Sequence, residues 1–141
     1  MLWLLALLLI GDPAAAQPSK PPEVVCDLVE RLDGYMEGRA FRGGRNDPED
    51  FVRFTFRDHD PAAGTTRMLV NDDPAELLVG MMVEAGAIVY LLEEPGTGKL
   101  MVSTATAPSP DGWSAIATRL TWSGGQLAVK VSAGACRMRP R

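Results

Sequence analysis

A long β-hairpin that ends on a cysteine constrains the fold of this chain more than any other stretch. Its two halves, residues 113–122 and 127–136, are separated by the turn sequence Ser-Gly-Gly-Gln. Two strand-like runs joined by glycines predict an antiparallel hairpin. The only other cysteine is Cys26. A bond between Cys26 and Cys136 would tie the hairpin to the start of the domain.

The two cysteines are expected to form this disulfide, because cysteines of exported proteins are most often paired. The bond would close a loop of about 110 residues. The chain-entropy model gives at most about 4.7 kcal/mol of stabilisation for a loop of that size. The alternative is two separate thiols, one of them catalytic. A catalytic thiol needs a base, and the single histidine, His59, lies in an expected turn.

The N-terminal segment predicts export. Residues 2–10 are an unbroken apolar run, followed by Gly-Asp-Pro and then by Ala14-Ala15-Ala16. This pattern is typical of a signal peptide (residues 1–16) cleaved after Ala16, although no Lys or Arg precedes the run. The run is shorter than the roughly 20 residues of a membrane span, so none is expected after cleavage. The expected location is periplasmic or secreted, and the alternative is an N-terminal helix of the fold.

Length and charge limit the organisation and the function. The chain has 141 residues, which allows a proline-rich linker (residues 17–22) and one domain (residues 23–141). An apolar fraction of 46% and a charged fraction of 23% are those of a folded globular protein. The net charge of −4 comes with no basic stripe, so nucleic acid is not an expected partner.

The expected fold class is mainly β: an antiparallel meander closing as a small barrel or sandwich, with one or two short helices. In residues 52–57, Val52, Phe54 and Phe56 alternate with polar side chains. Residues 65–70 return after a turn, residues 88–92 read as a central strand, and residues 100–105 form the next strand. Closing the meander would remove its open edges.

Two segments are ambiguous. Residues 23–32 carry apolar side chains at helical spacing after Pro22, which favours a short helix, although Val24 and Val25 also suit a strand. Residues 74–85 fit a capped helix or an alternating strand. The strand is slightly favoured because the neighbouring segments pair as hairpins.

Residues 34–50 are rich in glycine and predict a long loop. Within it, Arg39, Phe41, Arg42 and Arg45 form a possible partner-binding loop, since arginines on such a segment can grip an acidic partner. A solvated surface is the alternative reading. Trp113 and Trp122 in the closing hairpin are interpreted as core or edge packing residues, and a ligand platform is the alternative.

Other candidate sites fail on their spacing. Gly96-Thr-Gly98-Lys99 lacks the first glycine and the final Ser or Thr of a phosphate-binding loop. Residues 58–60, Asp-His-Asp, alternate in direction along an extended chain and so do not converge on a metal ion. No catalytic residue, cofactor or metal ligand is therefore assigned. A pair of carboxylates remains possible, because only geometry would select one.

The end of the chain, from Pro110-Asp-Gly112 through residues 125–129 to Gly134-Ala-Cys136, resembles small exported bacterial β-domains that finish on Gly-x-Cys. That resemblance implies export and a disulfide-closed sheet; the family is uncharacterised and implies no activity. The chain is also similar to periplasmic lysozyme inhibitors in size and in having a cysteine near each end, but it lacks recognisable residues of their reactive loop.

These observations lead to three hypotheses of function. The first is an exported, non-catalytic binding or structural module of the cell envelope, with an unknown protein or envelope component as partner. The second is a secreted inhibitor of an envelope hydrolase, acting through Arg39 to Arg45. The third is a hydrolase that uses two carboxylates.

Overall fold

The computed structural model describes residues 20–46, 51–94, 99–109 and 112–141. Within these residues the chain forms nine strands and no helix. The strands are β1 (Glu23–Glu37), β2 (Ala40–Arg45), β3 (Phe51–Asp60), β4 (Thr65–Val70), β5 (Leu77–Glu84), β6 (Ala87–Leu92), β7 (Lys99–Ser109), β8 (Gly112–Ser123) and β9 (Gln126–Arg139). The predicted signal peptide and residues 17–19 of the linker lie outside the described residues.

Eight of these strands form a ring of backbone hydrogen bonds. All neighbours are antiparallel, in the order β1-β3-β4-β5-β6-β7-β8-β9, and β9 returns to pair with β1. The ninth strand, β2, pairs with the second half of β1. The mainly β, antiparallel fold class is confirmed, and it closes without leaving an open edge in the ring.

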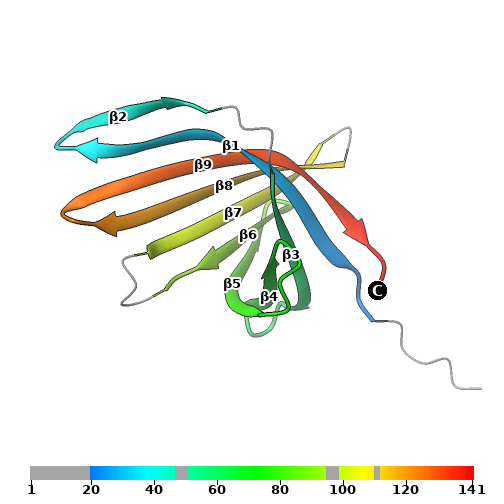
Figure 1. The fold of residues 1–141 in the computed structure, drawn as a ribbon. Coiled ribbons are helices and arrows are strands. Elements are labelled where there is room, and N and C mark those ends of the chain that lie inside the picture. The colour runs from blue at the N-terminus through cyan, green and yellow to red at the C-terminus, as the bar shows by residue number, and fades with distance from the viewer. Residues whose placement is uncertain (1–19, 47–50, 95–98, 110–111) are drawn as a thin grey trace, which may run out of the picture.

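The ring is an uneven barrel because its strands differ in length. β1 and β9 have 15 and 14 residues, whereas β4 and β6 have 6 each. The long strands therefore continue beyond the barrel, where β2, β1, β9 and β8 lie side by side as an extended sheet (Figure 1). The tips of the β1–β2 and β8–β9 hairpins point the same way.

Alternating side chains fill the barrel. In β3, Phe54 and Phe56 are buried in the core, as their alternation predicts. The Phe56 ring stacks on that of Tyr90 from β6, with centroids 3.6 Å apart. β3 and β6 are three strands apart around the ring, so this stack crosses the interior. Burying an aromatic side chain of this size contributes about 1.5–3 kcal/mol.

The helix favoured for residues 23–32 is wrong, because these residues belong to β1. Val24, Cys26 and Leu28 alternate into the core. The backbone pairs on both sides, with β3 along residues 24–29 and with β9 along almost its whole length. This pairing outweighs the helical spacing, and no helix occurs in the described part of the chain.

The long loop predicted for residues 34–50 is also wrong as far as residue 45. Residues 34–37 complete β1, Gly38 and Arg39 form a two-residue turn, and β2 follows. The glycines serve close backbone approach instead of a loop: Gly34 and Gly43 are cross-strand partners. The Phe41 ring lies against both, leaving no room for a Cβ atom at Gly34. Residues 47–50 lie outside the described residues.

Residues 77–84 form a strand, β5, in agreement with the favoured alternative for residues 74–85. Its hairpin with β6 turns through Ala85 and Gly86, both with positive φ. The β8–β9 hairpin turns in the same way through Gly124 and Gly125. Two-residue turns with two positive φ angles match the right-handed twist of the strands that they join.

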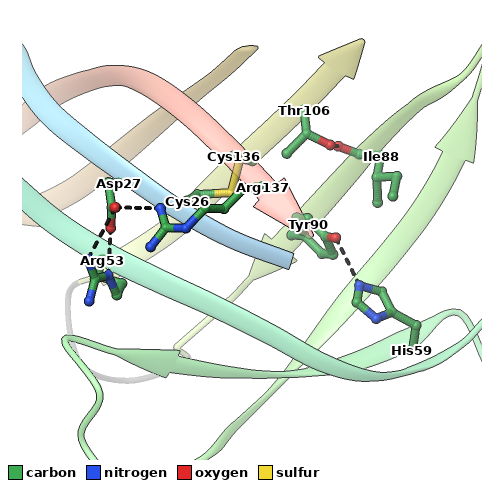
Figure 2. Close-up of a disulfide and its surroundings, with 9 residues drawn as sticks. All are labelled: Cys26, Asp27, Arg53, His59, Ile88, Tyr90, Thr106, Cys136 and Arg137. Atoms are coloured by element: carbon green, nitrogen blue, oxygen red, sulfur yellow. Dashed lines mark hydrogen bonds and ion pairs between the residues drawn. A yellow bond between two sulfur atoms is a disulfide. The ribbon is translucent and has the colours of Figure 1, made fainter. Parts of the chain in front are cut away.

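The predicted disulfide between Cys26 and Cys136 is confirmed. The two cysteines are directly opposite each other in the β1–β9 pair, and both side chains are buried. The bond therefore crosses the seam where the last strand meets the first (Figure 2). A disulfide is compatible with an oxidising, exported location.

Replacing both cysteines by alanine should lower the free energy of unfolding by about 2–5 kcal/mol, because the unfolded chain gains the freedom of a 110-residue loop. Urea denaturation of the oxidised protein and the double variant measures the difference. Equal midpoints with equal slopes would contradict a stabilising role for the bond.

Gly134→Ala should destabilise the barrel by about 1–3 kcal/mol. Gly134 is opposite Leu28 at the same seam, and an added Cβ would collide with the Asp27 carbonyl oxygen. Gly44→Ala is the matched control, since a Cβ there has nothing within 4 Å. Equal thermal midpoints for the two variants would show that the seam tolerates the extra atom.

Candidate functional site

A cavity of about 580 Å³ occupies one end of the barrel. Its lining comes from the middle of β1, the start of β3, the end of β4, the start of β5, the end of β6, and from β8 and β9. In an antiparallel ring these points all lie at one end, the end at which the long strands continue as the extended sheet (Figure 1). We refer to this space as the mouth cavity. Its volume is within the range of about 300–1,000 Å³ that small-molecule sites occupy.

The deep part of the mouth cavity is apolar. Leu28, Phe54 and Met68 are buried and form its floor. Further apolar side chains surround them: Phe51, Val52, Val70, Leu77, Leu92 and Ala117. These residues occupy inward positions of their strands, apart from Phe51, which is exposed at the start of β3. The walls therefore suit a hydrocarbon or an aromatic group.

One side of the mouth cavity is polar, and most of this polarity is already paired. The two carboxylate oxygens of Glu30 accept hydrogen bonds from Asn46 Nδ2 at 2.6 Å and from Lys130 Nζ at 3.2 Å. Lys130 also forms an ion pair with Asp33 at 3.3 Å. Glu94, another lining residue, has a partner of its own. Glu30, Asn46, Lys130 and Asp33 thus hold one another in place.

Arg119 is the exception. It lines the same cavity from β8, opposite Lys130 of β9, and continues the inward row of Ala115 and Ala117. Among the residues that the structure describes, its side chain has no hydrogen bond and no ion pair. A guanidinium group with five N–H donors thus stands at the cavity with no acceptor.

The opposite end of the barrel is filled. A register shift between Arg57 and Asp60, with Asp58 at positive φ, turns His59 toward the interior. There His59 Nε2 is 2.9 Å from the Tyr90 hydroxyl (Figure 2). Burial lowers the pKa of His59, although the Asp58 carboxylate opposes this, and burial raises the pKa of Tyr90 above its usual range. Both side chains are therefore neutral at pH 7.

Ion pairs cover the outer face beside the disulfide. The Arg53 guanidinium contacts both oxygens of Asp27, at 2.6 and 3.2 Å, and Arg137 reaches the same carboxylate at 2.8 Å (Figure 2). The hydrogen bond from Arg53 is the main reason why the pKa of Asp27 is lowered; partial burial opposes it and Arg137 reinforces it. Glu23 and Arg139 form a second pair across the seam. These contacts bind β3, β1 and β9 together.

The predicted partner-binding residues lie on the β1–β2 hairpin, away from the mouth cavity. Arg39 is in the turn, and Phe41, Arg42 and Arg45 are on β2. Arg42 forms an ion pair with Glu37 at 2.9 Å, Phe41 covers the glycines, and Arg45 has a partner. The structure thus gives each of the three β2 residues a contact within the chain.

The rejected motifs also have structural partners. Asp58 pairs with Arg141, His59 faces Tyr90, and Asp60 accepts a hydrogen bond from the Ala63 backbone, so the three side chains of residues 58–60 diverge. In the described ranges no three His, Cys, Asp or Glu residues are grouped so as to hold a metal ion. Residues 95–98, and with them most of the phosphate-loop-like sequence, lie outside those ranges.

Neither a long apolar helix nor any other candidate for a helical membrane span occurs in the part of the chain that the structure describes. Of the two tryptophans interpreted as packing residues, Trp113 packs against the core. Trp122 is exposed on the extended sheet, outside the core.

Sequence reasoning missed Arg119, Lys130 and Glu30. A signal for two of them was present in the closing hairpin. Arg119 is an even number of residues from Ala115 and Ala117, so it faces the same side of its strand as they do. Lys130 faces the same side of β9 as Cys136 for the same reason. Two cations on the inward face of a hairpin would have indicated a polar opening at one end of the barrel.

Comparisons with family models, with curated proteins and with solved structures find no match to this chain. The function is therefore inferred from the geometry of the mouth cavity.

The stability of the protein should fall as the pH is lowered from 7.5 to 5.5, in part because of His59. Its pKa in the folded protein is below the ordinary value of 6.5, so the unfolded chain binds the proton more readily and acidification favours unfolding. Urea denaturation at both pH values should show a smaller loss for His59→Gln than for the unchanged protein. An equal loss would mean that His59 does not titrate differently on folding.

Proposed function

We propose that this chain is an exported, non-catalytic binding module of the cell envelope that takes the apolar part of a small ligand into the mouth cavity. The observation that supports the proposal is a cavity of about 580 Å³ with an apolar floor and polar groups on one side. Sites for small molecules are mostly apolar, with a few placed polar groups that orient the ligand.

Export is part of this proposal. It is supported by the signal-like sequence of residues 1–16 and by the disulfide, which suits an oxidising compartment. A barrel closed by a covalent seam is also a rigid frame. A rigid frame lowers the entropic cost of ordering the site when a ligand binds.

The contacts favour binding over the alternative of a carboxylate-dependent hydrolase. Glu30 and Glu94 both line the mouth cavity, as such an enzyme would require. Both oxygens of Glu30, however, already accept hydrogen bonds from Asn46 and Lys130. Glu30 therefore holds Asn46 and Lys130 together in the wall of the cavity, a structural role that favours binding over catalysis.

The alternative of a secreted inhibitor has less support than ligand binding, because of the contacts within the β1–β2 hairpin. An inhibitory segment would present free side chains to the enzyme. Arg42 and Phe41 are instead engaged with Glu37 and with the glycines of their own hairpin.

The proposal predicts that the neutral fluorescent probe N-phenyl-1-naphthylamine binds the purified, disulfide-bonded protein with increased emission. Ala117→Phe, which places a ring in the cavity, should reduce the affinity at least tenfold by steric exclusion. Ala135→Phe is the matched control, because Ala135 is exposed and lies outside the cavity lining.

Ala117 is buried, so the variant could lose the fold. Leu77→Trp fills the cavity from a partly buried position and provides a second test. Circular dichroism shows whether each variant is folded. Folded cavity variants that bind the probe as well as the control does would contradict the proposal, and so would a protein that does not bind the probe.

A further inference from the structure

The unpaired guanidinium of Arg119 identifies the class of ligand. This inference rests on the function proposed above and adds the chemistry of the ligand's head group. We propose that the mouth cavity binds an anionic amphiphile, with an apolar chain on the floor formed by Leu28, Phe54 and Met68 and a carboxylate or phosphate on Arg119.

Arg119 lies on the inward side of the barrel wall, at the mouth cavity. It follows Ala115 and Ala117 on the inward face of β8, two alternating positions whose side chains are buried. The chain thus places an exposed cation directly above an apolar wall. An arginine needed only for solubility could occupy the outward positions of the same strand.

The charged groups next to Arg119 are already paired with one another. Lys130, the cross-strand neighbour of Arg119, is held between Glu30 and Asp33, at 3.2 and 3.3 Å. Glu30 is also engaged by Asn46, at 2.6 Å. Its carboxylate is therefore occupied, and Arg119 is left as the lining cation without an acceptor among the described residues.

The geometry of the guanidinium group suits an oxyanion. Its N–H groups form a planar fork that matches the two oxygens of a carboxylate or a phosphate. Such a bond is stronger beside an apolar wall than in open water, because fewer water molecules compete for it. A cationic or neutral head group would leave the fork unpaired, and a cation would in addition be repelled.

Three ligands with the same ten-carbon chain separate the head group from the chain: decanoate, decanol and decyltrimethylammonium. Each displaces N-phenyl-1-naphthylamine from the disulfide-bonded protein, below the concentration at which it aggregates. Decanoate should bind about tenfold more tightly than decanol, and the ammonium compound should bind most weakly. Decyl phosphate, used in place of decanoate, shows which oxyanion is preferred. The proposal is supported if either decanoate or decyl phosphate binds more tightly than decanol.

Arg119→Gln should reduce the affinity for decanoate about tenfold and leave that for decanol unchanged, because the chain still binds the apolar floor. Arg39→Gln is the matched control, with the same change of charge in the turn of the β1–β2 hairpin, outside the cavity lining. The affinity of Arg119→Lys for decanoate should lie between those of Arg119→Gln and Arg39→Gln, since lysine keeps the charge and loses the planar fork of N–H groups.

The proposal is overturned if decanol or the ammonium compound binds as tightly as decanoate and decyl phosphate. It is also overturned if Arg119→Gln and Arg39→Gln bind decanoate equally well. In these cases the probe still binds in the cavity. The proposed binding function then stands, and only the proposed anionic head group on Arg119 is wrong. Failure of the binding function itself is different, because neither the probe nor any of the ten-carbon ligands would then bind.

Discussion

The pairing of β1 with β9 is the interaction on which the rest of the structure depends. It joins the first and last strands along thirteen residue pairs, from Glu23 with Arg139 to Met36 with Leu127. Without it the meander would be an open sheet with two unpaired edges. Three further contacts reinforce the same seam: the Cys26–Cys136 disulfide, the Asp27–Arg137 ion pair and the pair formed by Glu23 and Arg139. The covalent bond lies inside the seam and the ion pairs lie outside it, so the closure is held from both faces of the sheet.

The seam also builds the polar side of the mouth cavity. Beyond Leu28 the two strands continue past the barrel, with a register shift between Glu30 and Leu32. The shift brings Glu30 opposite Ser132 and Asp33 opposite Lys130, so that Lys130 reaches both carboxylates. The contacts that close the barrel and those that order the cavity wall therefore belong to one continuous strand pair, and a change in its register would disturb both.

The strand pattern, the disulfide and the fold class could be predicted from the sequence, because each depends on local alternation or on compartment chemistry. The strand formed by residues 23–32 could not be predicted, because the spacing of their apolar side chains also suits a helix. Only the pairing with β3 and β9 decides in favour of a strand. The glycines of residues 34–44 indicated a loop because a glycine that permits close backbone approach, such as Gly34 beside Gly43, has the same sequence signature as one in a turn. The alternation of the closing hairpin places Arg119 on the inward face, but it does not show that Arg119 lacks a partner. Its importance comes from the partners that its neighbours have, and partners across strands depend on register.

The size of the inward side chains explains why the cavity is at one end only. Near the disulfide, Phe56 and Tyr90 stack across the interior, and the facing positions of β8 and β9 carry small residues such as Ala115 and Gly134. Large inward residues at that end therefore lie opposite small ones, an arrangement that suits the close packing of protein cores. One step toward the mouth, β8 and β9 still present small residues, Ala117 and Ser132, but no aromatic stack crosses the barrel among the described residues. The unfilled volume results from this change in the pattern, and it lies beside the one lining cation, Arg119, for which the described chain supplies no partner. The proposed binding function depends on this combination of an unfilled space and an unpaired donor, because an empty cavity lowers the stability of a folded protein.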